Sequence, residues 1–318
     1  MPFDPALCRK MDCLHQKANG PFNMPRFSLS VMATLLRRAR RVYREEGVRS
    51  TATKISSYII RRTFHTLGTW GLYNSKRYIS FLRWKNSGFS RYHAIADPFK
   101  IVPADPESIK YVTGRGPNPG RFQWQDIGMI ADGDWDQSSE RVDELPVVRA
   151  LSERFEEGRN WDEIDFIQRV KREARQGNAL WRGCTSEDDV RTQCHAVDNL
   201  YAAIAEHDYQ SKKELIMATE EIPSSRQQIP TQFEPYDEVV VDISRDGEFL
   251  FVDGRHRLAI AKILEIDEIP VRISARHAEW QQVREMLHET PSEDVPAAVK
   301  QHLDHPDLQA LIDAEKEM

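Results

Sequence analysis

The clearest pattern of apolar and polar positions lies in residues 187–207. Five residues recur there with alternating spacings of four and three, which places them on one face of a helix: Val190, Cys194, Val197, Tyr201 and Ile204. Thr185 or Ser186 precedes this helix and is suited to cap its first turn. Similar patterns predict helices over residues 146–157, 162–176 and 277–288.

Residues 238–273 show a different pattern, rich in β-branched and aromatic side chains. Glu238–Ile243 and Phe249–Val252 are predicted strands, and the Asp-Gly pair between them is typical of a hairpin turn. Asp253-Gly254 then leads into a helix, and Ile269–Ile273 is predicted as a third strand. The order of hairpin, helix and strand among the other helices favours the α+β class.

The first hundred residues differ from the rest in charge. Residues 1–100 hold 19 Lys and Arg against five Asp and Glu, whereas the remaining residues hold 25 against 45. Residues 28–46 and 51–67 are predicted basic helices, and Trp, Tyr and Arg residues mix in the stretch that ends near residue 85. Such a segment suits an anionic membrane surface, single-stranded nucleic acid, or the chain's own acidic body.

The composition excludes several classes of protein. Apolar residues make up 40% of the chain and charged residues 30%, and no apolar run approaches the roughly 20 residues of a membrane-spanning helix. Four cysteines are too few for a disulfide framework. We therefore expect a cytoplasmic protein with a sizeable core, with peripheral association at the membrane as the alternative that the basic segment allows.

The segment Asp253-Gly254-Arg255-His256-Arg257 carries the most specific chemistry. It follows a strand and begins a helix, where backbone N–H groups lack partners and the helix dipole is positive. Gly254 lets an anion approach the backbone, Arg255 and Arg257 offer guanidinium donors, and His256 can donate or move a proton. This predicts a phosphate-binding turn. In the alternative, Asp253 only caps the helix and the arginines pair with acidic neighbours, Arg257 being the most suited to a structural role.

Residues 252–261, followed by Ile269-Pro270-Val271, resemble the signature segment of the ParB/sulfiredoxin-like superfamily, which has a Gly-x-His-Arg turn before a helix. The match is specific over residues 238–277 and looser over parts of residues 105–136 and 200–210. The resemblance implies a small mixed sheet with flanking helices.

That resemblance also implies a domain organisation. Residues 97–290 would form the ParB/sulfiredoxin-like domain, with a helical insertion at about 137–185. Residues 1–26 are expected to be a disordered leader, residues 27–96 a basic helical arm, and residues 291–318 a polar tail with a short helix near 307–316.

Members of the superfamily bind nucleotide phosphates at this turn. The resemblance therefore implies a nucleoside di- or triphosphate (ATP, ADP or CTP) as the ligand of residues 253–257. Sulfiredoxins have a Cys where this chain has Arg255, and the chromosome-partition members have a DNA-reading helix-turn-helix that does not follow here. The branch that phosphorylates free serine shares the Asp-Gly-x-His-Arg turn, which implies a phosphotransferase or nucleotide hydrolase with an unknown small-molecule acceptor and His256 as a catalytic residue.

Phosphoryl transfer also requires carboxylates to bind Mg²⁺ and to orient the acceptor. Asp134 and Asp136 are the candidates for both the metal site and catalysis, because the resemblance places their segment beside the turn. His277, at the start of a helix after the last strand, is a candidate to donate to the same ligand. The alternatives are a capped turn around Trp135 and ordinary packing of His277.

Overall fold

The computed structural model describes residues 79–84, 92–115, 127–218 and 236–316. The chain divides into two compact units, residues 1–73 and 74–318, and all described residues belong to the second. The boundary that we expected near Asp97-Pro98 falls inside this unit. The expected leader and the two basic helices of residues 28–67 lie outside the described residues.

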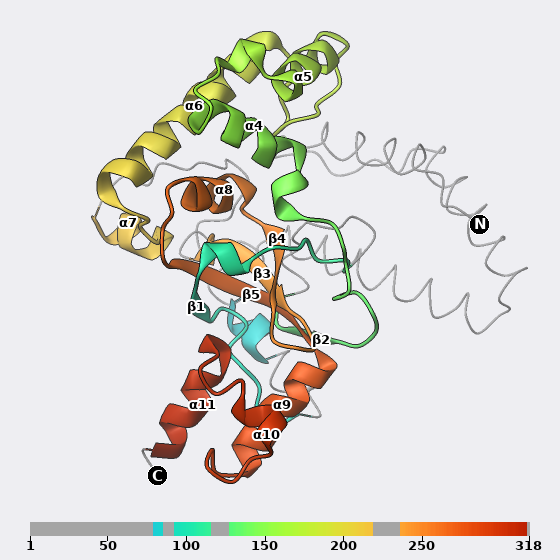
Figure 1. The fold of residues 1–318 in the computed structure, drawn as a ribbon, viewed down its shortest axis with the longest axis vertical. Coiled ribbons are helices and arrows are strands. Elements are labelled where there is room, and N and C mark those ends of the chain that lie inside the picture. Colours follow the sequence, from blue (N-terminus) through green and yellow to red (C-terminus); the bar gives the residue numbers. More distant parts are fainter. Residues whose placement is uncertain (1–78, 85–91, 116–126, 219–235, 317–318) are drawn as a thin grey trace, which may run out of the picture. The chain divides into compact units, whose positions relative to one another are not determined.

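A five-stranded mixed sheet forms the centre of the described unit, which confirms the α+β class (Figure 1). Its strands are β1 (Ile101–Ala104), β2 (Met129–Ala131), β3 (Val239–Ile243), β4 (Phe249–Asp253) and β5 (Ile269–His277). The order is β1-β5-β3-β4, and β2 also pairs with β5. β5 runs parallel to β2 and β3 and antiparallel to β1, so it is the central strand.

The predicted hairpin is present as β3 and β4, which pair in antiparallel register around the turn at residues 244–248. Gly247 in this turn has φ +84°, and a Cβ there would lie 2.6 Å from the Trp280 ring. The hairpin gives the sheet two opposite ends. We call them the hairpin end, at residues 244–248, and the α8 end, where β3 starts and β4 finishes.

Helices α4 (Pro146–Phe155), α5 (Asp165–Arg175) and α6 (Glu187–His207) lie beyond α8 (Arg255–Ile263), seen from the sheet (Figure 1). α6 has the predicted bounds, and Ser186 caps it by accepting a hydrogen bond from Asp189 N. Most of its apolar stripe is buried, including Cys194. A helix that the periodicity did not predict, α7 (Lys212–Ala218), follows. Short 3-10 turns occur at Pro106–Ser108, Val142–Glu144 and Trp161–Glu163.

The segment after Pro291 has the short helix that we predicted near residues 307–316, but it packs on the rest of the unit and is not a polar tail. α9 (Ala278–Glu289), α10 (Ala297–Lys300) and α11 (Pro306–Lys316) gather at the side of the sheet away from α8 (Figure 1). Leu308 is fully buried, and the carboxylate of Asp307 is fully buried between the guanidinium groups of Arg276 and Arg284. These ion pairs fix α11 to β5 and α9, a long-range effect that local polarity does not reveal.

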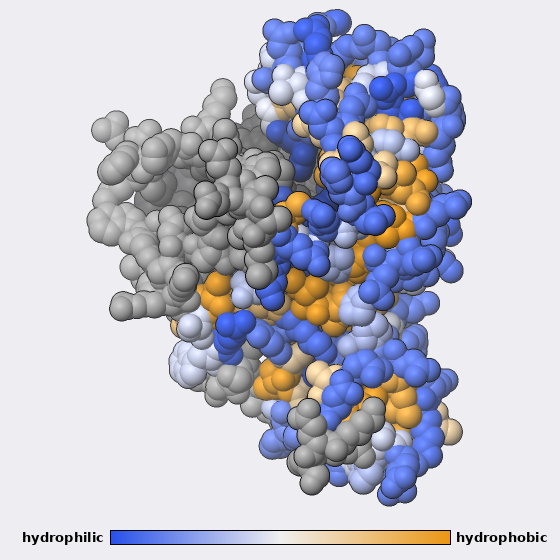
Figure 2. Space-filling view, turned by 90° about the vertical axis from the view of Figure 1, so that its left-hand side faces the viewer, coloured by the Kyte–Doolittle hydropathy of each residue, from blue (hydrophilic) through white to orange (hydrophobic). Residues whose placement is uncertain are grey.

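Residues 79–84, within the expected basic arm, are helical and pack on this unit. Ile79 and Leu82 are buried, and the guanidinium of Arg83 pairs with Asp97. Figure 2 shows one face of the molecule, mostly hydrophilic, with hydrophobic residues gathered across its middle. Within the part of the chain that the structure describes, none of the helices combines the length and the apolar character needed to cross a bilayer.

Candidate functional site

The turn that the sequence singled out joins β4 to α8 at the α8 end of the sheet. Gly254 has φ +94°, and a Cβ added to it would lie 3.0 Å from Val239 Cα in the neighbouring strand. Both facts favour glycine, because other residues rarely adopt this φ and have no room here. Asp253 Oδ1 accepts a hydrogen bond from Gly254 N, one residue before the helix begins. Among the described residues, no side chain caps the N-terminus of α8.

Arg257 does not extend toward a ligand. Its guanidinium donates to Glu238 Oε2 at 3.1 Å and lies 3.5 Å from Asp237 Oδ1. The Glu238 side chain is fully buried and also accepts a hydrogen bond from Lys212 N at the start of α7. Arg257 therefore joins α8 to β3 and, through Glu238, to α7. For Arg257, the geometry therefore agrees with the alternative interpretation, in which the arginine pairs with acidic neighbours.

The surroundings of Arg257 form a cluster of ionisable groups, which we call the Glu238 cluster: Tyr209, Asp237, Glu238, Arg257 and Arg272. Burial raises the pKa of Glu238 to about 7, although Arg257 and the N–H of Lys212 oppose it. Burial also lowers the pKa of Arg272 to about 9, against the attraction of Asp237 and Asp253. Perturbed groups of this kind gather at functional sites. Sequence reasoning missed the cluster, although an Asp-Glu pair entering a buried strand was a signal for it.

His256 is also engaged within the protein. Its ring is buried, and its Nε2 accepts a hydrogen bond from Trp181 Nε1 at 3.2 Å. Trp181 lies between α5 and α6, inside the expected insertion. His256 Nε2 is therefore not available as a proton donor to a ligand.

Arg255 is the exposed guanidinium of the turn. It makes no hydrogen bond and no ion pair with any part of the chain that the structure describes. Its position on the first residue of α8 adds a positive charge to the positive end of the helix dipole. Of the groups that the sequence offered to an anion, Arg255 and the first backbone N–H groups of α8 remain available to one. Arg257 adds a buried positive charge behind them.

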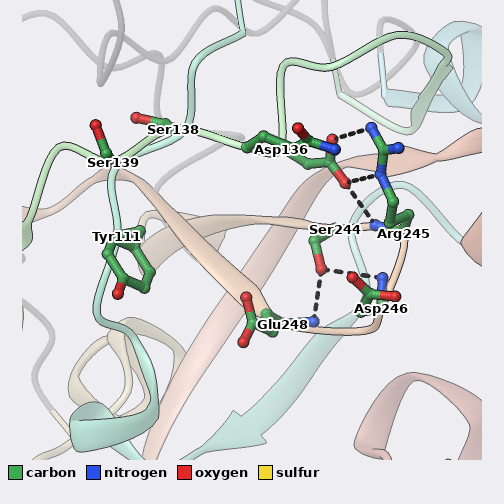
Figure 3. Close-up of a pocket in the computed structure, with 9 residues that line it drawn as sticks. Tyr111, Asp136, Ser138, Ser139, Ser244, Arg245, Asp246 and Glu248 are labelled. Atoms are coloured by element: carbon green, nitrogen blue, oxygen red, sulfur yellow. Dashed lines mark hydrogen bonds and ion pairs between the residues drawn. The ribbon is translucent and has the colours of Figure 1, made fainter.

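Asp134 and Asp136 lie at the hairpin end, not beside the turn. Arg245 donates from Nε and Nη2 to the two oxygens of Asp136, each at 2.8 Å (Figure 3). Arg245 Nη2 also donates to Asp134 Oδ1 at 2.9 Å. Burial alone would raise the pKa of Asp136, but the hydrogen bonds from Arg245 outweigh it and lower this pKa to about 2. The five residues of β3 separate the two ends by roughly 13 Å at about 3.3 Å per residue.

These contacts do not fit a magnesium site. Arg245 occupies Asp134 and Asp136, and Arg257 occupies Asp237 and Glu238. No group of three or more His, Cys, Asp or Glu side chains within the described ranges is placed to hold a metal ion. The structure therefore does not bring the predicted metal ligands to the predicted phosphate-binding turn.

His277 lies at the hairpin end as well. It is fully buried, its Nδ1 accepts a hydrogen bond from Glu279 N, and its Nε2 donates to Gly133 O at 2.9 Å. Because Nδ1 is the acceptor, Nε2 carries the proton. His277 thus caps α9 and holds the loop of Gly133, and it is far from the ligand that it was expected to contact.

The hairpin end has a hollow of about 320 Å³. Figure 3 shows the serine hydroxyls, the Tyr111 ring and the acidic side chains around it. Ser244 Oγ accepts hydrogen bonds from Asp246 N and Glu248 N, which shapes the turn. The lining residues are Tyr111, Asp136, Gln137, Ser138, Ser139, Ser244, Arg245, Asp246 and Glu248. None of them belongs to the turn at residues 253–257, so this hollow is a separate feature.

Comparisons with known proteins gave no match: no protein-family model, no curated protein and no solved structure is similar to this chain.

Proposed function

We propose that this protein binds a phosphate-bearing ligand, a nucleoside di- or triphosphate, at the N-terminus of α8. The observation that carries the proposal is the exposed Arg255 on the first residue of a helix whose N-terminus no described side chain caps. Unpaired N–H groups and the helix dipole attract an anion, and a guanidinium matches phosphate oxygens.

The fixed groups behind the turn support this proposal. Gly254 leaves the backbone without a Cβ in front of the helix, so an oxygen can approach closely. Arg257 contributes a buried positive charge that Glu238 holds in place. The resemblance of residues 252–261 to the superfamily turn is a further, independent support.

The proposal concerns binding rather than phosphoryl transfer. The carboxylates that were expected to bind Mg²⁺ lie at the hairpin end and are paired with Arg245. His256 Nε2 is occupied by Trp181. We therefore assign no catalytic step to Asp134, Asp136 or His256.

Calorimetric titration of the full chain tests the proposal. ATP, ADP, CTP, GTP and inorganic phosphate are titrated, each with and without Mg²⁺. We expect at least one nucleotide to bind, and Arg255→Ala to weaken its binding about tenfold, as loss of a charged hydrogen bond does. Lys300→Ala removes a positive charge on exposed Lys300 in α10, on the far side of the sheet, and should leave binding unchanged. Binding that is equal in Arg255→Ala and the wild type contradicts the proposal.

Nucleic-acid binding and association with an anionic membrane were predicted from the composition of residues 28–85, and both stay predictions. Most of these residues lie outside the described ranges. Within residues 79–84, Arg83 pairs with Asp97 of the same unit, which favours the third possibility, contact with the acidic body, for that residue. Salt-dependent binding of single-stranded DNA and flotation with anionic vesicles test the other two.

A further inference from the structure

The contact between Trp181 and His256 links the helical insertion to the proposed phosphate site. The two side chains are 5% and 7% exposed, and their rings stack with centroids 5.9 Å apart and planes 30° apart. The Phe166 ring of α5 packs edge-on against the Trp181 ring, with their centroids 5.8 Å apart. Trp181 is thus held by the insertion, and His256 is held by Trp181.

The chemistry of the two rings determines where the proton of His256 lies. An indole N–H can only donate a hydrogen bond, so His256 Nε2 is the acceptor at 3.2 Å and carries no proton. A neutral imidazole has one N–H, which must then be on Nδ1.

We infer that Trp181 is a positioning residue of the phosphate site: it fixes His256 in the neutral tautomer protonated at Nδ1. The part of this inference that concerns ligand binding rests on the proposed function. His256 is the second residue of α8, so a fixed ring also fixes the first turn whose N–H groups would face the anion. In this form, the His256 ring is neutral, and its single N–H is on Nδ1.

The tautomer is measured first, in the absence of ligand. Histidine ring nitrogens are observed by NMR in the full chain labelled with ¹⁵N-histidine, and His256 is assigned from the signals lost in His256→Gln. We expect a non-protonated Nε2 and a protonated Nδ1 near neutral pH. Trp181→Phe keeps an aromatic ring and removes the donor, so the fraction of His256 with a non-protonated Nε2 should fall. A protonated Nε2 in the wild type overturns the inference, and this result does not depend on whether any variant folds.

Nucleotide titration then tests the positioning role. Trp181→Phe should weaken binding about fivefold, which corresponds to one ordinary hydrogen bond. Phe166→Leu changes the packing on Trp181 but keeps its N–H, and should change binding less than about twofold. If the wild type binds a nucleotide and Trp181→Phe binds it equally well, the positioning role is refuted. If the wild type binds none, the proposed function fails, while the spectrum still decides the tautomer.

Discussion

Arg257 Nη1 donates a hydrogen bond to Glu238 Oε2 at 3.1 Å, where the Glu238 side chain is fully buried and the Arg257 side chain is 15% exposed. This pair joins the first turn of α8 to the start of β3. It removes from solvent one of the two arginines that the sequence offered to a phosphate, and it leaves Arg255 as the exposed one.

Replacing Glu238 tests how much the Arg257–Glu238 pair contributes to the stability of the fold. Glu238→Ala removes the acceptor of both the Arg257 guanidinium and Lys212 N, so the guanidinium keeps only the more distant Asp237. We expect the free energy of unfolding in urea to fall by about 3 kcal/mol. The matched control is Asp188→Ala, because Asp188 forms an exposed pair with Arg191 and its loss should change stability by less than about 0.5 kcal/mol.

The same carboxyl group predicts a dependence of stability on pH. Burial raises the pKa of Glu238 to about 7 from an ordinary value of 4.5. Between these values the folded state holds this proton more firmly than the unfolded state, so the contribution of Glu238 to stability falls as pH rises from about 4.5 to 7. Urea unfolding at pH 5 and pH 7.5 should show a smaller decrease in Glu238→Gln than in the wild type. Equal decreases in the two proteins would mean that the Glu238 carboxyl does not cause the dependence of stability on pH.

A substitution at Gly254 separates backbone strain from lack of space. Gly254→Ala must adopt φ +94° and place Cβ 3.0 Å from Val239 Cα, so we expect a loss of about 2 kcal/mol or more in thermal or urea unfolding. Gly133→Ala is the control, because Gly133 has φ +101° but open space around its Cβ position. It should cost only about 1 kcal/mol. Equal losses in the two variants would show that contact with β3 contributes nothing.

The carboxylate of Asp307 is predicted to hold the C-terminal helices on the sheet. Burial alone would raise its pKa, but Arg276, Arg284 and the indole N–H of Trp280 keep it well below the ordinary value. Asp307→Asn leaves two buried guanidinium groups short of a negative charge and should cost about 3–5 kcal/mol. Hydrogen exchange should also quicken in α9 and α11. Asp304→Asn, at an exposed position three residues earlier, should change neither quantity.

Local elements were predictable wherever neighbours in the sequence determine them. The apolar stripe and the Ser186 cap of α6 act within one helix, and the Asp-Gly turn of the hairpin acts within four residues. The short strands β1 and β2 were not predicted in detail, because they exist through pairing with β5 at a long distance in the chain. The helices α9 and α11 were predicted from local periodicity, but the packing of the segment after Pro291 on the sheet was not, since the partners of Asp307 lie in β5 and α9.

The sequence by itself determined that residues 253–257 form a glycine turn opening a helix, because φ freedom, helix periodicity and strand propensity are local properties. Only the tertiary structure decided which of its side chains face solvent. Arg257 meets Glu238, His256 meets Trp181 from 75 residues away, and Asp136 meets Arg245 across 109 residues. A charged side chain chooses its partner by where the packed strands and helices place it, and that placement depends on the whole core.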